Sequence, residues 1–198
     1  MPSSSFARFY ESYFGDPYMA WHDGLDEEAL LSLSGEERKE AERLLIEGMK
    51  TTDHRPAAGL AALRSPRTTE LLKADLPLVH GRRCVEVGLA LWRMEEYRPA
   101  MEAIIGVLRR DHDWGNRLDA ARALREVRTP ESEAALWKAL DDREMLVRYH
   151  SAASLLEMHG IPAGIEKSHP LTIKVMTEEK KERAGAIKEL RALLRESK

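Results

Sequence analysis

The sequence predicts an all-α protein, an α-solenoid of about four helix pairs with helical caps at both ends. Apolar residues recur at intervals of three and four along most of the chain, as on the buried side of a helix. Similar segments return about every 30 residues, a spacing typical of stacked helix pairs. The segments between them begin with proline, which favours the first helical position because the N–H it lacks has no partner there.

Residues 1–50 are predicted to form an acidic, aromatic-rich helical cap. The face of its first helix consists of Phe6, Phe9, Tyr10, Tyr13 and Phe14. Tyr18, Trp21 and His22 follow, either as a contact surface or as aromatic cover for the open end of the helix stack. The sequence favours the second interpretation, because a terminal helix pair needs a cover.

Two further helices complete the predicted cap, one over 26–33 and one after Ser34. Ser34 and Glu37 have the S-x-x-E spacing of a capping box, and Leu44, Leu45 and Met49 would be buried. The cap region 1–50 holds 5 lysines and arginines against 11 acidic residues. We interpret this charge as a hydrated helical surface rather than a docking site for a basic partner.

Residues 51–160 form the predicted repeat array. Four segments align: PAAGLAAL (56–63), CVEVGLAL (84–91), RLDAARAL (117–124) and RYHSAASL (148–155). Their last leucines are 28, 33 and 31 residues apart, and small residues before them would let neighbouring backbones approach closely. Second helices are expected over 66–74, 99–110 and 130–140.

The segments NRLDAARALREV (116–127) and VRYHSAASLLEMHG (147–160) resemble the HEAT repeat, in particular the HEAT-like units of phycobilin lyases. In these units an acidic turn residue precedes a Val-Arg pair and an alanine-rich stretch. Here Asp111 precedes Arg117 by six residues, and Asp142 precedes Arg148 by six. The resemblance covers about 53–160, and it implies a structural ladder of Asp–Arg contacts and binding along a concave face.

Residues 161–198 lie outside the resemblance and predict a loop followed by a C-terminal capping helix. Thr177 is the expected cap of that helix. The expected buried side consists of Ala184, Ile187, Leu190, Leu193 and Leu194.

The resemblance places the first helix of each pair on the concave side, where side chains that avoid the core would contact a partner. These predicted contact residues are Glu86, Trp92, Arg93, Asp119, Arg122, Arg125, Tyr149, His150 and Glu157. Mixed charge with tryptophan and arginine suits a protein partner. The alternative is that the same residues only hydrate the surface.

No catalytic or cofactor site is expected. Glu86, Asp119 and His150 fall in aligned positions and resemble a metal-ligand set, but the chain has no H-E-x-x-H motif and no zinc-ligand spacing. The HEAT-like deoxyhypusine hydroxylases bind iron through His-Glu pairs, and this dipeptide occurs nowhere in the chain. Cys84 replaces the arginine of its segment, and we expect a buried, unreactive thiol.

Nucleic-acid binding is the main alternative, because some HEAT-like proteins are DNA glycosylases with a basic groove. The candidate groove residues are Arg109, Arg110, Arg117, Arg122, Arg125, Arg128 and Trp114. Residues 81–150 nevertheless hold 13 basic and 13 acidic residues, whereas phosphate binding needs uncompensated cations. A chromophore-lyase-type accessory role is implied by the resemblance alone.

We therefore expect a non-catalytic protein-binding module, an adaptor or an inhibitor of the immunity type, that is monomeric and cytoplasmic. The single cysteine excludes an intramolecular disulfide and suits a reducing compartment. No stretch has the length and apolar character of a membrane span, and the N-terminal residues do not have the pattern of a secretory signal.

Overall fold

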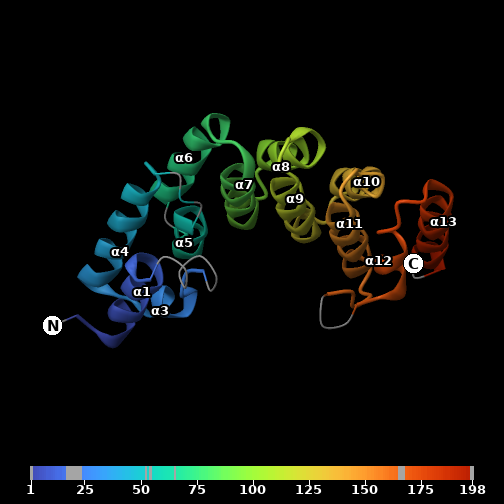
Figure 1. Cartoon of the computed structure of the whole chain (residues 1–198). Coiled ribbons are helices and arrows are strands. Elements are labelled where there is room, and N and C mark those ends of the chain that lie inside the picture. The colour runs from blue at the N-terminus through green and yellow to red at the C-terminus, as the bar shows by residue number, and fades with distance from the viewer. Residues whose placement is uncertain are drawn as a thin grey trace. The chain divides into compact units, whose positions relative to one another are not determined.

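The computed structural model describes residues 2–16, 24–51, 53, 55–64, 66–164 and 168–196, without the side chains of 66 and 196. This part of the chain is helical and contains no strand, which confirms the all-α prediction (Figure 1). The chain forms two compact units, Met1–Val79 with Glu86–Ala100, and His80–Val85 with Met101–Lys198. Tyr18, Trp21 and His22 lie outside the described residues.

The first unit contains the N-terminal helices. They are α1 (Ser4–Phe14), α3 (Glu27–Ser32), α4 (Gly35–Gly48), α5 (Arg55–Leu63), α6 (Pro66–Asp75), a 3-10 turn (Leu76–Leu78) and most of α7 (Gly81–Glu95). The aromatic residues of α1 divide between two sides: Phe9 and Tyr13 are buried, whereas Tyr10 and Phe14 are exposed. Helix α1 packs against α3 (Figure 1).

The predicted capping box at the start of α4 is wrong. Ser34 makes no side-chain hydrogen bond to the helix end. The Glu37 carboxylate instead accepts hydrogen bonds from the backbone N–H and the hydroxyl of Ser3, both at 2.6 Å. Ser3 also caps α1, because its Oγ accepts the N–H of Phe6. The two donors of Ser3 therefore replace the single backbone N–H that Glu37 would bind in a capping box.

The second unit contains the remaining helices. They are α8 (Arg98–Arg110, from Met101 on), α9 (Trp114–Val127), α10 (Pro130–Ala139), α11 (Met145–Met158), α12 (Pro170–Lys174) and α13 (Lys180–Glu196). Helices α9 and α11 lie side by side, and α10 packs against both (Figure 1).

Small residues line the contact between α9 and α11. Ala120, Ala121 and Ala152 are completely buried. The hydroxyl of Ser154 donates a hydrogen bond of 2.9 Å to the carbonyl of Ala121, so a side chain of one helix meets the backbone of the other. This close approach requires short side chains, since longer ones would separate the backbones.

The C-terminal segment differs from expectation in two details. Thr177 lies three residues before the first residue of α13 and not at the N-terminal cap position. Its hydroxyl oxygen accepts the N–H of Glu179 in the turn that precedes the helix. Ala184 is exposed, whereas Ala186, Leu190 and Leu194 are buried. The buried side of α13 is therefore turned away from Ala184.

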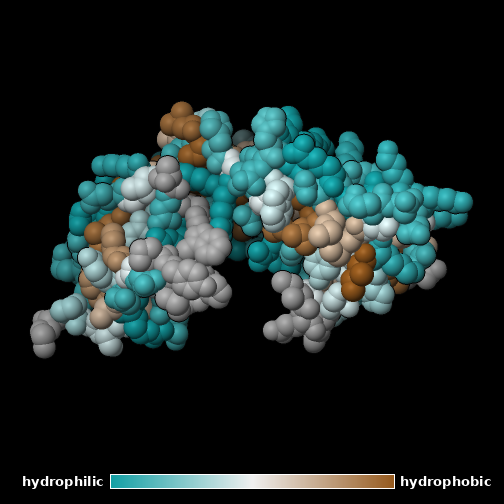
Figure 2. Space-filling model, in the orientation of Figure 1, coloured by the Kyte–Doolittle hydropathy of each residue, from teal (hydrophilic) through white to brown (hydrophobic). Residues whose placement is uncertain are grey.

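Hydrophilic residues predominate on the side of the molecule shown in Figure 2, and hydrophobic residues form small separate groups there. Within the described residues, no helix combines the length and the apolar character that crossing a bilayer requires.

Candidate functional site

Two buried arginines fix the start of α9 and of α11. Arg117 in the first turn of α9 donates two hydrogen bonds of 2.8 Å to the carboxylate of Asp142. It also donates to the carbonyls of Asp111 and His112 in the turn that precedes α9. The hydrogen bonds to Asp142 raise the pKa of Arg117, so the guanidinium stays charged although only 5% of its side chain is exposed.

Arg148 occupies the same place on α11 and is 1% exposed. It donates to five backbone carbonyls, those of Asp142, Arg143, Val175, Met176 and Thr177. Its carboxylate contact is with Glu178, at 2.7 Å. Arg148 thus joins the turn before α11 to the chain segment after α12.

The Asp111 side chain bonds to its own turn. Its carboxylate accepts the backbone N–H of Asp113 at 2.9 Å and the side-chain amide of Asn116 at 3.2 Å. Cys84, the residue aligned with Arg117 and Arg148, is buried, and burial raises the pKa of its thiol.

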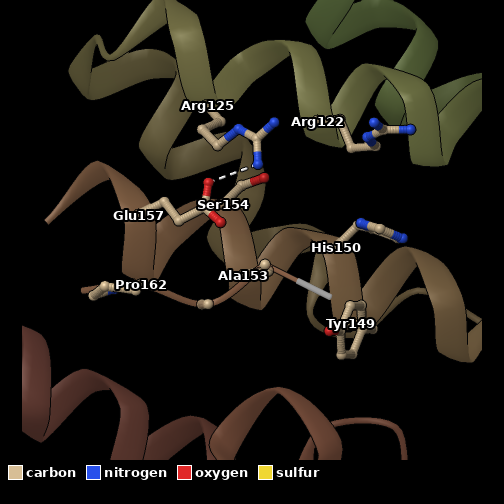
Figure 3. Close-up of a pocket in the computed structure, with 10 residues that line it drawn as sticks. Arg122, Arg125, Tyr149, His150, Ala153, Ser154, Glu157 and Pro162 are labelled. Carbon is tan, nitrogen blue, oxygen red and sulfur yellow. Dashed lines mark hydrogen bonds and ion pairs between the residues drawn. The ribbon is translucent and has the colours of Figure 1, made fainter. Parts of the chain in front are cut away.

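A cavity of about 500 Å³ opens between α9, α11 and the chain after α11 (Figure 3). Its wall consists of Arg122, Arg125, Tyr149, His150, Ala153, Ser154, Glu157, Pro162, Ala163 and Gly164. All of these residues belong to the second unit. The two arginines come from α9, and the residues from Tyr149 to Glu157 come from α11.

One side of the cavity is closed by an ion pair. Arg125 donates to Glu157 at 2.6 Å, and their side chains are 33% and 23% exposed (Figure 3). Arg128 adds a bond of 3.3 Å to the Glu157 carbonyl. Arg125 is therefore neutralised by a carboxylate of the neighbouring helix.

Arg122 and His150 extend from their two helices toward the same side of the cavity (Figure 3). Arg122 is exposed and makes no hydrogen bond or ion pair within the described part of the chain. His150 is half-buried, and its ring meets that of Tyr149 edge-on at 5.1 Å. Burial, then the charges of Arg122 and Arg125, lower the pKa of His150, so its imidazole is neutral at pH 7.

The hydrogen-bonding groups of the cavity wall are partly engaged within the protein. A general base needs a hydrogen-bonded nucleophile or substrate proton within reach. Among the described wall residues, Ser154 alone is a serine or threonine, and its hydroxyl already donates to a backbone carbonyl. His150 has no hydrogen bond among the described residues.

The structure brings five of the nine predicted contact residues to this cavity. They are Arg122, Arg125, Tyr149, His150 and Glu157. Asp119 lies outside the cavity wall and faces Arg82 at 3.5 Å, with a pKa raised by burial. Glu86, Trp92 and Arg93 belong to the first compact unit.

The sequence did not indicate the remaining wall residues. Ser154 and its neighbour Ala153 belong to a small-residue stretch that predicts a packing contact between helices and no binding role. For the segment with Pro162, Ala163 and Gly164 the sequence predicts a loop and indicates no site. The sequence feature that could have indicated these three loop residues is their position shortly after the helix that holds Tyr149 and His150.

No set of three or more His, Cys, Asp or Glu residues in the described ranges is arranged to hold a metal ion. Of the three residues weighed as metal ligands, Glu86 belongs to the first unit, and Asp119 and His150 to the second. No protein-family model, curated protein or solved structure matches the chain.

Proposed function

We propose that this chain is a HEAT-like α-solenoid that binds another protein on its concave face, as an adaptor or an inhibitor. The arginine positions support the proposal. Arg117 and Arg148 lie in the first turns of α9 and α11, and each bonds a carbonyl of the turn before its helix. The ion pair of Arg117 with Asp142 corresponds to one contact of the Asp–Arg ladder that the HEAT resemblance implies.

One observation supports the binding role most directly. Five residues expected to contact a partner, from 122 to 157 in the sequence, surround a single cavity on α9 and α11. Arginine and tyrosine are enriched among residues that dominate binding energies at protein interfaces. Arg122 has no ion-pair partner among the described residues and remains available to a partner's acidic group.

The charges argue against a nucleic-acid groove. Arg117 and Arg125 are each bonded to a carboxylate, Asp142 and Glu157, respectively. Paired arginines release few counterions, so they add little to phosphate affinity.

The test is affinity capture of the tagged chain from nuclease-treated lysate of its own host, comparing wild type with Arg122→Glu and Tyr149→Ala. We expect a stoichiometric protein partner that is lost with either variant. Arg125→Glu is unsuitable, because it would place two carboxylates together and destabilise the helices.

Arg110→Glu is the matched control, since it makes the same charge change at an exposed position on α8. Trp92→Ala is a separate arm that asks whether the interface includes the first unit. A partner that survives Arg122→Glu and Tyr149→Ala, or is lost equally with Arg110→Glu, would show that the interface is elsewhere.

A further inference from the structure

The cavity beside α9 and α11 has the size of a small-molecule site. Its volume of about 500 Å³ falls within the range of roughly 300–1,000 Å³ found for ligand pockets. Such pockets combine apolar walls with a few polar groups that fix the orientation of the ligand.

The charged residues in the described part of the wall have a net charge of +1. Arg122 and Arg125 contribute two positive charges, and Glu157 contributes one negative charge. Because Arg125 is bonded to Glu157 at 2.6 Å, the positive charge that has no ion pair within the described wall belongs to Arg122. Asp119, outside the wall on the same helix, interacts with Arg122 electrostatically, but no ion pair joins them within the described residues. A net charge of +1 matches a monoanion such as a carboxylate better than a dianion.

Each polar group on the Arg122 side of the cavity can supply a hydrogen-bond donor. A guanidinium presents a planar fork of N–H groups that fits the two oxygens of a carboxylate. The neutral imidazole of His150, which extends to the same side as Arg122, carries one N–H donor (Figure 3). The Tyr149 hydroxyl is a third possible donor on the adjacent residue.

Apart from Ser154, whose hydroxyl donates to the Ala121 carbonyl, the rest of the described wall is apolar or glycine. Ala153 lies on α11 between the polar groups and the loop, and Pro162 and Ala163 form the loop side. A carboxylate held at Arg122 would therefore carry a hydrocarbon or aromatic body toward these residues and the Tyr149 ring.

We propose that this cavity binds a small organic monocarboxylate, with Arg122 as the principal carboxylate ligand and the alanine and proline wall in contact with its apolar body. This site goes beyond the proposed protein-binding function and does not depend on it, because it needs no partner surface. Capture of a protein partner and binding of a small acid are therefore separate results.

The experiment titrates phenylacetate, hexanoate and acetate into the full-length protein and follows binding by calorimetry and by the NMR signals of the His150 ring. We expect phenylacetate or hexanoate to bind with a dissociation constant of roughly 1–10 mM or tighter, as suits ligands of this size. Acetate should bind more weakly, since it lacks the apolar body. The bound carboxylate should raise the apparent pKa of His150, because it offsets the positive charge of Arg122.

Two comparisons isolate the carboxylate contact. Phenylacetamide has the same shape without the charge and should bind at least about tenfold more weakly. Arg122→Gln should weaken phenylacetate binding roughly tenfold to 100-fold, whereas Arg110→Gln should leave it unchanged. Arg122 is exposed and makes no hydrogen bond within the described chain, so thermal unfolding should show that Arg122→Gln folds.

Three results would each overturn the proposal. The first is that none of the three acids binds below about 10 mM, the weak end expected for ligands of this size. The second is that phenylacetamide or inorganic phosphate binds as tightly as phenylacetate. The third is that Arg122→Gln binds phenylacetate as well as the wild type does. The amide and phosphate comparisons use the unaltered protein and remain decisive if the variant does not fold.

Discussion

Arg117 and Arg148 occupy the same position in two neighbouring helices, α9 and α11, yet their charges are compensated differently. Arg117 bonds a carboxylate, Asp142, whose side chain is 12% exposed. Arg148 is more deeply buried but has five carbonyls around it, and its carboxylate partner, Glu178, is 78% exposed. The same sequence signal thus leads to a part-buried ion pair with two carbonyl bonds at Arg117, and to five carbonyl bonds with an exposed carboxylate partner at Arg148.

The difference shows what a buried arginine requires. A buried charge is costly unless it is paired and its N–H groups are bonded. The acidic turn before α11 supplies Asp142 to Arg117, whereas the segment after α12 supplies the carbonyls of Val175, Met176 and Thr177 to Arg148. Backbone carbonyls carry partial negative charge, and several of them together replace one carboxylate.

Removal of Arg148 is expected to have the largest effect. Arg148→Met leaves five carbonyls without their donor, and we expect the free energy of unfolding to fall by about 3–5 kcal/mol. Urea unfolding followed by circular dichroism measures this. The control is Arg143→Met, an exposed arginine of the preceding turn, which should change stability by less than about 1 kcal/mol. Equal losses in the two variants would mean that the carbonyls around Arg148 find other donors.

The next prediction compares the stability effects of removing the two carboxylates, Asp142 beside Arg117 and Glu178 beside Arg148. Asp142→Asn removes the counter-charge of buried Arg117, and we expect a loss of about 3 kcal/mol, near the lower end for breaking a buried pair. Glu178→Gln should leave the urea midpoint unchanged within error, because its carboxylate is solvated and the carbonyls remain. A large loss in Glu178→Gln would show that Arg148 depends on an ion pair as Arg117 does.

A smaller effect is expected on the pH dependence of the free energy of unfolding, through His150. The pKa of His150 lies below its ordinary value of 6.5, because of burial and the charges of Arg122 and Arg125. The unfolded chain therefore binds a proton more readily, and the contribution of neutral His150 to stability is present above about pH 6.5. That contribution should be lost as the pH falls from 6.5 through the lower folded pKa.

Unfolding of wild type and His150→Gln at pH 7.5 and pH 5.5 tests this. The wild type should lose more stability between these pH values than the variant, since glutamine does not titrate. Equal pH dependence in the two proteins would show that His150 is not the responsible group.

The last prediction concerns the thiol reactivity of Cys84, the residue aligned with Arg117 and Arg148 in the sequence. Burial and the charge of Asp111 raise the pKa of its thiol, so little thiolate forms near neutral pH. We expect an aromatic disulfide reagent to react with the folded protein much more slowly than with the urea-unfolded chain. A folded-state rate close to that of the unfolded chain would place Cys84 at an accessible, reactive site.

Much of the local structure could be predicted from the sequence. The spacing of apolar residues and the prolines at 66, 99 and 130 predict helices close to those observed, because these signals act within a few residues. The alanine and serine residues of α9 and α11 predict a close helix contact, and the structure places the Ser154 hydroxyl against the Ala121 carbonyl there. Cys84 was expected to be buried, and it is.

Polar partners could not be predicted in the same way. Glu37 has the spacing for a local cap but bonds Ser3, 34 residues away in the chain. Asp119 resembled a contact residue but faces Arg82. A long polar side chain can reach acceptors or donors on several elements, and local spacing does not distinguish among them.

In the candidate site, too, the sequence indicated individual residues but not how they pair. The resemblance singled out Arg122, Arg125, Tyr149, His150 and Glu157, but only the tertiary structure placed them around one cavity. It also pairs Arg125 with Glu157 and leaves Arg122 without an ion-pair partner among the described residues. The sequence by itself determined the helices and which side of each is apolar, since these depend on periodicity and local hydrogen bonding. Tertiary structure decided which charges are neutralised and which stay available, because that depends on distances between residues far apart in the chain.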